Sequence, residues 1–502
     1  YEAEKTASEI IRELNNRGIW SGEIQNIRKD GSTFWCEASV MELIHPNHGK
    51  VWVSTHSDIT EQKTFNQKIW RQANFDNLTQ LPNRKHFCEH SQEHLQDALR
   101  LGNQFALLFV DIDDFKIIND TLGHRHGDAL LIEVASRIEQ CVPQTDLLCR
   151  FGGDEFAILM MDTDHDRPST IEPLAKKLLN AISAPYLIRG EAENISASIG
   201  ISTFPRDAKT IDDLIQYADQ AMYKAKDQGK NNYYFFTPAL QTLAQHNRQL
   251  EKELRSAIKK RQLSLHLQPI VDCQNGSIHK AEALLRWQHP DLGFIPPSEF
   301  IPIAEETKLI NELGEFVFEE CINILQKLNS LGITDFQISL NKSPIQFLPA
   351  GFETEINWPN KMKQAGLNNN ALCIEITEGI FLDQSSDTMK KINTLKESGF
   401  YFSIDDFGTG YSSLSYLNKV DFDFLKIDKS FIDTLESDAN TQAMCEAIIV
   451  MAHTLKMKVI AEGIETREQF ERLKDLNCDY CQGYYFSKPL PENSFYEIIT
   501  KI

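Results

Sequence analysis

The sequence lacks the features that mark a membrane-spanning, exported or nucleic-acid-coating protein. No apolar run reaches the roughly 18 residues that a membrane-spanning helix needs, and no signal peptide is visible. Positive charge is scarce, because 51 Lys and Arg against 72 Asp and Glu give a formal net charge of -21 at pH 7. Such acidity opposes non-specific binding to nucleic acid or anionic lipid. We therefore expect no nucleic acid polymer among the partners, no membrane contact from this segment, and local cations or metals around any phosphate-bearing ligand.

An initiating methionine is also absent, because the chain starts at Tyr1. We therefore expect a fragment of a longer protein with cytoplasmic domains. A missing N-terminal part leaves open a tether to the inner membrane.

Paired cysteine motifs are nearly absent. Cys478-x-x-Cys481 is the one close pair among ten scattered cysteines, and a four-cysteine zinc site would need a second pair. We expect reduced thiols in a cytosolic protein.

What the sequence does have is the composition of an ordinary globular chain, with 41% hydrophobic and 25% charged residues over 502 positions. That length predicts about three domains, each large enough for its own core.

One stretch combines an apolar run with two carboxylates. Residues 400–404 read as a buried strand that stops on Asp405 and Asp406, and Gly408 and Gly410 then allow the backbone to turn. Two close carboxylates repel each other, whereas divalent cations let both stay charged. A metal site and a solvated acidic turn are equally compatible with this stretch alone.

The last 240 residues alternate strand and helix candidates about eight times, which fits a (β/α)₈ barrel. Polar residues interrupt successive strand ends, and such ends meet at one mouth of a barrel. They are Glu282, Asn341, Glu375, Asp405, Asp406, Lys426, Glu462 and Gln482. An acid cluster with one lysine is more than a solvated face requires, so the pattern favours a metal site.

The segment 76–236 also alternates helix and strand. One apolar run ends in Asp111, and a glycine turn precedes Asp154 and Glu155. Because Mg²⁺ prefers carboxylates plus phosphate oxygens, acids from two strands predict a two-metal nucleotidyl-transfer site.

Three motifs of this segment resemble the GGDEF diguanylate cyclase family. They are Asp76-x-Leu78-Thr79-x-Leu81-Pro82-Asn83-Arg84, Arg150-Phe151-Gly152-Gly153-Asp154-Glu155-Phe156 and Ala221-Met222-Tyr223-x-Ala225-Lys226-x-x-Gly229-Lys230-Asn231. The resemblance implies up to two Mg²⁺ or Mn²⁺ ions held by Asp111, the Ile112 carbonyl, Asp154 and Glu155. It further implies guanine and ribose contacts from Asn119, His124 and Asp128, and phosphate contacts from Lys226 and Lys230. Each such domain binds one GTP, so the cyclase reading requires a homodimer.

The last segment resembles the EAL phosphodiesterase family throughout. The motifs are Gln268-Pro269-Ile270-Val271, Glu282-Ala283-Leu284-Leu285-Arg286, Glu375-Ile376-Thr377-Glu378, Asp405-Asp406-Phe407-Gly408-Thr409-Gly410, Lys426-Ile427-Asp428, Glu462-Gly463-Ile464-Glu465 and Gln482-Gly483. The resemblance implies two Mg²⁺ or Mn²⁺ ions surrounded by Glu282, Asn341, Glu375, Asp405, Asp406 and Glu462. It also implies a water positioned and deprotonated by Lys426 and Glu462, a phosphate contact from Arg286, guanine contacts from Gln268 and Gln482, and a loop braced by Glu378. The reaction would open cyclic di-GMP to linear pGpG.

Two positions depart from these families. The cyclases' product-inhibition site is Arg-x-x-Asp, and this chain has Pro143 in place of the arginine, with Asp146 kept. Proline offers no guanidinium for a phosphate, so we expect weak or absent feedback. Lys342 follows Asn341 where an apolar residue is more usual; since neighbouring strand side chains face opposite ways, we expect little effect on the metal.

The N-terminal residues read as a helix and three strands, with a hairpin turn at Asp30-Gly31. They resemble the second half of a PAS sensor domain in the motifs Trp20-Ser21-Gly22-Glu23, Lys29-Asp30-Gly31 and Asp58-Ile59-Thr60-Glu61. A connecting helix follows, either a spacer that pairs with its copy or a plain linker. A second helix, starting at Thr237-Pro238 with one apolar stripe, is either a hinge or a rigid strut.

The predicted fold is therefore α/β and multidomain: a partial PAS sheet, a GGDEF α/β domain and an EAL domain that forms a TIM-like (β/α)₈ barrel. The predicted boundaries are 1–59, 60–75, 76–236, 237–260 and 261–502. Two other functions remain open, a nucleotide receptor without turnover and a net cyclase with a subdued hydrolase. The retained metal-ligand residues favour a cyclic di-GMP hydrolase whose GGDEF domain binds GTP and is able to cyclise it.

Overall fold

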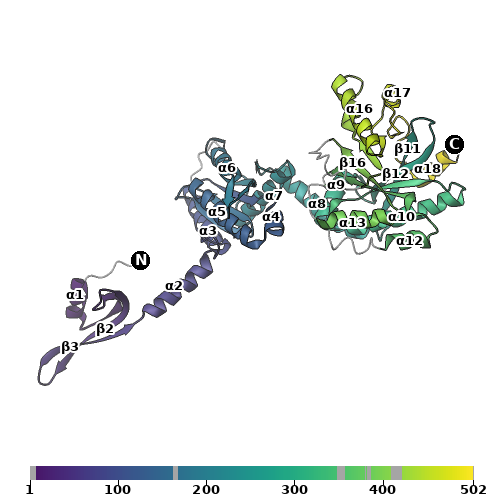
Figure 1. Ribbon diagram of the computed structural model, residues 1–502. Coiled ribbons are helices and arrows are strands. Elements are labelled where there is room, and N and C mark those ends of the chain that lie inside the picture. The colour runs from purple at the N-terminus through teal and green to yellow at the C-terminus, as the bar shows by residue number, and fades with distance from the viewer. Residues whose placement is uncertain are drawn as a thin grey trace. The chain divides into compact units, whose positions relative to one another are not determined.

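The computed structural model describes residues 7–161, 168–347, 357–378, 380, 386–408 and 421–500, and the chain divides into two compact units, Tyr1–Ala244 and Gln245–Ile502 (Figure 1). Gly410, predicted to help the turn after Asp406, lies outside the described residues together with Thr409. No helix among the described residues is long and apolar enough to cross a membrane.

The N-terminal part is a helix followed by an antiparallel sheet in the order β1-β2-β3. The elements are α1 (Ala7–Arg17), β1 (Ile19–Ile27), β2 (Thr33–His45) and β3 (Gly49–Asp58). Its small core contains Leu14, Trp20, Cys36 and Ala38. The predicted helix and three strands are confirmed, although this sheet alone does not identify a PAS domain.

The predicted connecting helix is present as α2 (Thr60–Asn74). Its apolar residues Phe65, Ile69 and Trp70 are 63%, 47% and 54% exposed. An exposed apolar stripe is compatible with pairing to a second copy, and that pairing remains a prediction.

The rest of the first unit is built on a five-stranded sheet in the order β10-β9-β4-β6-β5. Its elements are α3 (Arg84–Leu101), β4 (Phe105–Ile112), α4 (Phe115–Leu122), α5 (His124–Cys141), β5 (Leu147–Gly152), β6 (Glu155–Met160), α6 (Pro168–Ser183), β7 (Tyr186–Ile188), β8 (Glu191–Glu193), β9 (Ala197–Phe204), α7 (Ile211–Asp227) and β10 (Asn232–Phe235).

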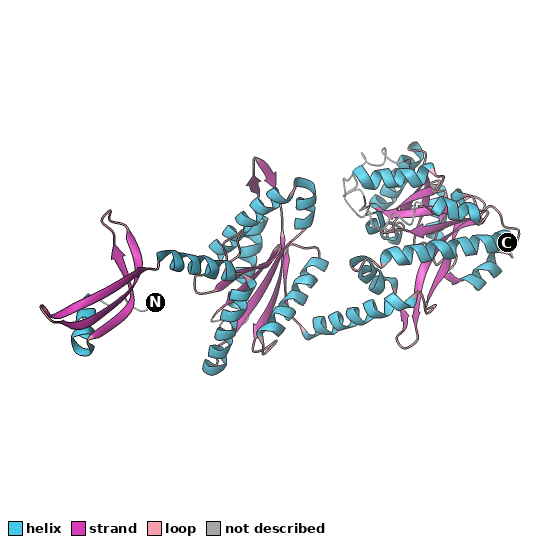
Figure 2. Ribbon diagram, turned by 90° about the horizontal axis from the view of Figure 1, so that it is seen from below, coloured by secondary structure: helices cyan, strands magenta, loops and turns pink. Residues whose placement is uncertain are grey.

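Helices cover both faces of this sheet (Figure 2). On the central strand β4, Leu108 and Val110 join the core formed with α5 and α6. Leu107 and Phe109 point the other way and pack with α3 and α7. Because alternate strand residues face opposite sides, this continuous apolar run needs a helical layer on each face.

The second unit is a closed barrel. Its elements, with the helix leading into it, are α8 (Pro238–Ala257), β11 (Leu263–Asp272), β12 (Ile278–His289), β13 (Gly293–Ile295), α9 (Pro297–Glu306), α10 (Ile310–Ser330), β14 (Gln337–Asn341), η1 (Pro344–Phe347), α12 (Trp358–Gln364), η2 (Asn369–Ala371), β15 (Leu372–Thr377), α13 (Ser386–Glu397), β16 (Tyr401–Phe407), β17 (Phe424–Ile427), α15 (Lys429–Asp433), α16 (Ala439–Thr454), β18 (Lys458–Ala461), α17 (Arg467–Asp475), β19 (Tyr480–Cys481), β20 (Leu490–Pro491) and α18 (Glu492–Ile499).

The barrel differs from the predicted (β/α)₈ pattern in one strand. The strands from β12 and β14 through β19 pair in parallel, but β11 pairs antiparallel with both β12 and β19 and closes the ring. A short turn joins β11 to β12, whose residues pair directly, as in a hairpin. A strict strand–helix alternation is therefore wrong at the start of this domain.

The second half of α8 belongs to the barrel unit. Leu250, Leu254 and Ala257 are buried in one cluster with Trp287 and Phe300. The prediction that the apolar stripe packs rather than hangs free is confirmed for these residues.

Candidate active and metal-binding sites

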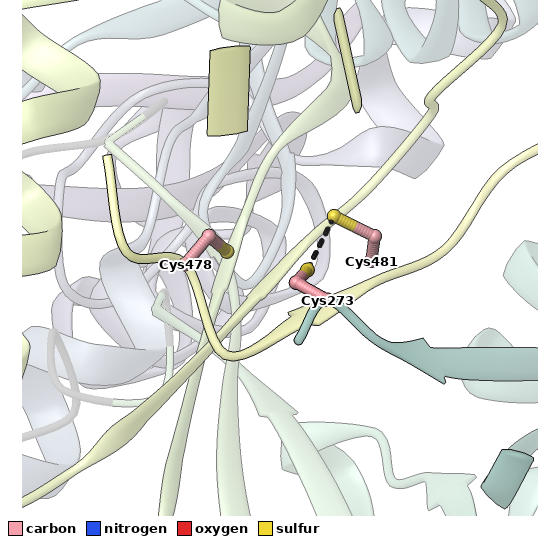
Figure 3. A group of neighbouring side chains, drawn as sticks. All are labelled: Cys273, Cys478 and Cys481. Carbon is pink, nitrogen blue, oxygen red and sulfur yellow. Dashed lines mark hydrogen bonds between the residues drawn. The ribbon is translucent and has the colours of Figure 1, made fainter. Parts of the chain in front are cut away.

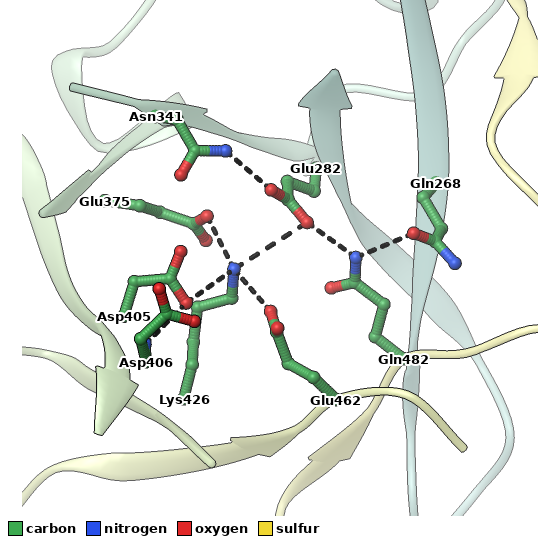
Figure 4. A network of polar contacts seen from close by, with 9 residues as sticks. All are labelled: Gln268, Glu282, Asn341, Glu375, Asp405, Asp406, Lys426, Glu462 and Gln482. Atoms are coloured by element: carbon green, nitrogen blue, oxygen red, sulfur yellow. Dashed lines mark hydrogen bonds and ion pairs between the residues drawn. The ribbon is translucent and has the colours of Figure 1, made fainter. Parts of the chain in front are cut away.

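The polar residues predicted at successive barrel strands come together at one mouth (Figure 4). Asn341 ends β14, Glu375 lies near the end of β15, and Glu462 directly follows β18. Ladder pairs place Asn341 opposite Glu375 and Thr377 opposite Asp405, so the acids lie on adjoining strands. The register explains why residues far apart in the sequence share one site.

Lys426, on β17, is the centre of this cluster. Its Nζ lies 2.7 Å from Glu375 Oε2 and 2.5 Å from Glu462 Oε1. The same nitrogen lies 3.3 Å from Asp405 Oδ1 and 3.7 Å from Glu282 Oε2. Four carboxylates, three on strands and one directly after a strand, therefore point at one ammonium group whose side chain is only 1% exposed.

Asp405 and Asp406 both reach the site because the backbone is irregular there. The ladder between β16 and β17 shifts register between Ile404 and Phe407, and Asp406 adopts a left-handed φ of 54°. Such a bulge turns a side chain that would otherwise face away. The predicted turn is present, but it lies within β16, which continues to Phe407, rather than after the strand.

The loop after this bulge is held from a neighbouring strand end. Gly408 has a φ of 95°, and its N–H donates to Glu378 Oε2 at 3.2 Å. A glycine is favoured here because L side chains rarely adopt this φ. This contact is what the predicted bracing by Glu378 requires.

The two predicted guanine-contacting glutamines lie side by side against the acid cluster. Gln482 Nε2 donates to Glu282 Oε2 at 2.6 Å and to Gln268 Oε1 at 3.1 Å. Asn341 Nδ2 donates to the other oxygen of Glu282 at 2.6 Å. Glu282 is thus oriented by amides on both sides.

A cavity of about 340 Å³ opens beside the acids, with Arg286, Asn341 and Glu375 in its wall. Lys342 also lines it, is 3% exposed, and has its Nζ 4.5 Å from the Phe347 ring centroid. This ammonium therefore lies over an aromatic ring rather than in the Lys426 cluster.

The acids fit a cation. Asp405, Asp406 and Glu462 offer oxygens that all lie within 4.8 Å of one another. Glu375 Oε1 is buried and, in the part of the chain that the structure describes, has no hydrogen-bond partner. An orphaned carboxylate oxygen beside other oxygens is what a hard divalent cation would satisfy.

The electrostatics of the barrel mouth agree with this. Burial raises the pKa of Glu375 well above its usual value and that of Glu462 to about 8. Burial alone would lower the pKa of Lys426, but the four surrounding carboxylates raise it well above its usual value. One lysine does not neutralise all these acids, so further positive charge would stabilise their ionised forms.

In the first unit, Asp111 and Glu155 are cross-strand partners on β4 and β6. Ile112 N donates to the Asp154 carbonyl at 3.3 Å. Burial raises the pKa of both Asp111 and Glu155. The structure thus brings the predicted acids to one end of the sheet, although no three of them gather as closely, among the described residues, as those of the barrel.

The predicted phosphate-binding lysines occupy this acidic end. Lys226 Nζ lies 2.7 Å from Asp111 Oδ1, and Lys230 Nζ lies 2.7 Å from Asp114. Phosphate oxygens could exchange with these carboxylates as partners of the two ammonium groups.

The predicted guanine and ribose residues lie on α4 and α5. Asn119 is on α4, while His124 and Asp128 are exposed in the first turns of α5. A Cβ at Gly127 would lie 2.1 Å from Asn119 Oδ1, so a larger residue at position 127 would displace the Asn119 amide.

Some positioning residues were not predicted. Asp113 is 4% exposed and accepts hydrogen bonds from Ser196 Oγ at 2.5 Å and Ser198 Oγ at 2.7 Å. Asn231 N also donates to it, at 3.2 Å. These bonds hold the end of β4 in place next to Asp111. The sequence does not predict this role, because two serines near the start of a strand form no recognisable motif.

Fold and sites together define a protein with two clusters of acidic residues, one at the end of an α/β sheet and one at the mouth of a barrel. Residues 73–232 match the family model "Diguanylate cyclase, GGDEF domain", and residues 251–489 match the EAL domain model. The bifunctional diguanylate cyclase/cyclic di-GMP phosphodiesterase MucR of Pseudomonas aeruginosa is 42% identical over 426 residues, which are 85% of this chain and 62% of MucR. The cyclic di-GMP phosphodiesterase PdeR of Escherichia coli is 31% identical over 460 residues, 90% of this chain and 68% of PdeR.

The chain therefore belongs to the family of proteins that carry a GGDEF domain followed by an EAL domain. It spans less than two thirds of the length of MucR. Among solved structures, the S helix-GGDEF-EAL part of Vibrio cholerae LapD, bound to c-di-GMP, has a TM-score of 0.56 at 20% identity and covers 85% of this chain and 99% of that chain. That likeness concerns the fold.

Proposed function

We propose that the chain is a cyclic di-GMP phosphodiesterase that opens its substrate to linear pGpG in the barrel. The observation that supports this most strongly is the set of four carboxylates around Lys426 Nζ. MucR and PdeR match this chain over both domains, and their names support cyclic di-GMP as the substrate.

The proposed metal ligands are the residues that surround the barrel mouth. They are Glu282, Asn341, Glu375, Asp405, Asp406 and Glu462. Two Mg²⁺ or Mn²⁺ ions held there would lower the pKa of an attacking water and stabilise charge on the attacking and leaving oxygens.

The chain's own residues would do the rest. Lys426 fixes Glu462 through Oε1, which leaves Oε2 to accept a proton from the water. Burial raises the pKa of Glu462, and the cations would stabilise its ionised form, which is the form that accepts a proton. Arg286 would hold a phosphate at the cavity wall, Gln268 and Gln482 would contact guanine, and Glu378 would keep the bulge in place.

We also propose that the GGDEF domain binds GTP and is able to cyclise it in a homodimer. Up to two Mg²⁺ or Mn²⁺ ions would be held by Asp111, the Ile112 carbonyl, Asp154 and Glu155. Asn119, His124 and Asp128 would contact guanine and ribose, and Lys226 and Lys230 would exchange their acidic partners for phosphates. The exposed stripe on α2 would bring two copies together.

The remaining parts follow the same resemblance. We propose a PAS-like end at 1–59, a connecting helix at 60–75, a GGDEF domain at 76–236, a hinge helix at 237–260 and an EAL domain at 261–502. The domains would work in the cytoplasm.

The test is to incubate the chain with cyclic di-GMP, and separately with GTP, in Mg²⁺ or Mn²⁺ and to identify products by chromatography. We expect pGpG from wild type and from Glu397→Ala, an exposed acid on α13, and none from Glu282→Ala. Binding without turnover of either nucleotide would instead identify a receptor. Net synthesis of cyclic di-GMP would identify a cyclase with a subdued hydrolase.

A further inference from the structure

Three cysteines far apart in the sequence form one buried group in the barrel unit (Figure 3). Cys273, Cys478 and Cys481 are 1%, 0% and 0% exposed. Their sulfurs all lie within 4.8 Å of one another, and Cys273 Sγ lies 2.9 Å from Cys481 Sγ. Spacing in the sequence indicates the Cys478 and Cys481 pair, but only the fold brings Cys273 to it.

The group lies at the short ladder between β11 and β19, a seam where the barrel closes. The strand β19 has two residues, and its ladder to β11 consists of Val271 opposite Cys481 and Asp272 opposite Tyr480. Cys273 directly follows β11, and its N–H donates to the Asp479 carbonyl at 3.0 Å. A seam held by so few backbone bonds opens locally at lower cost than the longer ladders, which gives small reagents access to buried thiols.

The three thiols are not equivalent. Cys478 Sγ is a donor to the backbone carbonyl of Tyr480 at 3.3 Å and to that of Val459 at 3.7 Å. Cys273 and Cys481 instead face each other. Their separation is less than about one ångström longer than an S–S bond of about 2.05 Å.

We propose that Cys273 and Cys481 form a reversible disulfide that fastens this seam, with a peroxide as the oxidant. One thiolate attacks the O–O bond of hydrogen peroxide to give a sulfenic acid and hydroxide, which takes up the thiol's proton to leave as water. The second thiol then displaces the sulfenic oxygen as a second water, so two thiols and one peroxide give one disulfide and two waters.

Charge favours this product over a bound metal. A disulfide is neutral, whereas a thiolate metal site would leave net negative charge among apolar neighbours. A tetrahedral zinc site needs four ligands, and no fourth His, Cys, Asp or Glu joins the group among the described residues. The neighbouring thiol groups, Cys478 first and then Cys481, lower the pKa of the Cys273 thiol, which makes it the first nucleophile.

The crosslink would also act on the active site. Cys481 immediately precedes Gln482, and Cys273 continues the strand that carries Gln268, so both strands of the Gln268–Gln482 contact would be tied together. This consequence rests on the proposed function: the oxidised form should show a changed KM for cyclic di-GMP, with a smaller change in kcat. The disulfide itself does not rest on that function.

The experiment treats the reduced chain with one equivalent of hydrogen peroxide, blocks free thiols in denaturant, and maps the peptides without reduction. We expect free thiols to fall by two from the ten present, and the peptide with Cys273 to be linked to the one with Cys478 and Cys481. The melting temperature of the oxidised chain should rise by several degrees, because the crosslink joins residues 208 positions apart. Dithiothreitol should reverse the rise.

Cysteine variants show which two of the three thiols are linked. The link should persist in Cys478→Ala and in the control Cys321→Ala, a buried cysteine on α10, and disappear in Cys273→Ala. Fragmentation of the linked wild-type peptides, which places the bond on Cys478 or on Cys481, decides the proposal even if a variant fails to fold. A bond between Cys478 and Cys481, three unmodified thiols after oxidation, or one tightly bound zinc or copper ion shielding them would each overturn it. If hydrolysis is absent but the link forms, the proposed function fails and this proposal stands.

Discussion

The two acid centres differ in how far the protein alone assembles them. In the barrel, the Lys426 side chain is 1% exposed and its Nζ lies within 3.7 Å of four carboxylates. In the GGDEF domain, Lys226 is 31% exposed and pairs with Asp111. The buried lysine offsets the negative charge of the barrel acids in the folded protein without any ligand. The partly exposed lysine offsets less of the charge in the GGDEF domain, so that centre depends more on metal and nucleotide.

The largest expected difference between the two centres is how much each lysine stabilises the fold. Lys426→Met leaves buried carboxylates unpaired and should lower the free energy of unfolding by about 3 to 5 kcal/mol when divalent ions are removed. Lys226→Met breaks a partly exposed pair and should cost less than about 1 kcal/mol. Scanning calorimetry of both variants in a chelator measures this, and equal losses would erase the distinction between the two centres.

Lys426→Met should also lower the rate of cyclic di-GMP hydrolysis by at least about 100-fold, because the water and Glu462 lose their orienting charge. Chromatographic detection of pGpG measures the rate. Wild-type turnover in a folded Lys426→Met chain would remove the lysine from the proposed chemistry.

The two centres should also differ in how they respond to metal ions. Because the barrel acids are already gathered, Mn²⁺ alone should raise the melting temperature of the barrel by several degrees, corresponding to about 2.7 kcal/mol at 100 times Kd. The GGDEF domain should respond only when GTP is added with the metal.

Asp405→Asn removes one ligand and should abolish the barrel shift, while Asp111→Asn should leave it unchanged. Differential scanning fluorimetry makes the measurement. A barrel that responds to Mn²⁺ only in the presence of nucleotide would show that its site is not preassembled.

A smaller effect is expected at Glu378, which holds the bulge through Gly408 N. Glu378→Ala removes the acceptor and should lower kcat by about 10-fold or more, in keeping with about 1.5 to 3 kcal/mol for a lost hydrogen bond to a charged group. Glu378→Gln keeps a carbonyl oxygen and should retain most activity. Equal activity of Ala and Gln variants would mean that the acceptor does not position Asp405 and Asp406.

The smallest effect concerns feedback on the cyclase. Asp146 Oδ1 already accepts from Met161 N at 3.1 Å, and Pro143 supplies no guanidinium. In the hydrolysis-dead Glu282→Ala background, GTP cyclisation should resist excess cyclic di-GMP, and Pro143→Arg should introduce inhibition. Steep inhibition without the added arginine would contradict the prediction.

Much of the barrel site could be predicted because its acids interrupt apolar strands, and a fold of this type collects strand ends. Glu282, Glu375, Asp405 and Glu462 all lie within 3.7 Å of Lys426 Nζ, as convergence at one mouth requires. The alternation of apolar and polar residues fixes each strand's inward face, and the parallel register then fixes the neighbours.

Other features depended on geometry that no local pattern encodes. The antiparallel direction of β11 follows from its direct turn into β12, which a count of strands and helices does not resolve. The left-handed backbone of Asp406 is unusual for a residue other than glycine, so the sequence suggested a turn after the acids instead of a bulge between them. Cys273 reaches Cys481 only because β11 closes the ring against β19.

Diffraction from a crystal soaked in Mn²⁺ and cyclic di-GMP, with data collected at the manganese edge, tests the central claim most directly. We predict two anomalous peaks between Glu282, Asn341, Glu375, Asp405, Asp406 and Glu462, with the scissile phosphate beside them. A nucleotide seated at the barrel mouth with no manganese among these residues would contradict the account.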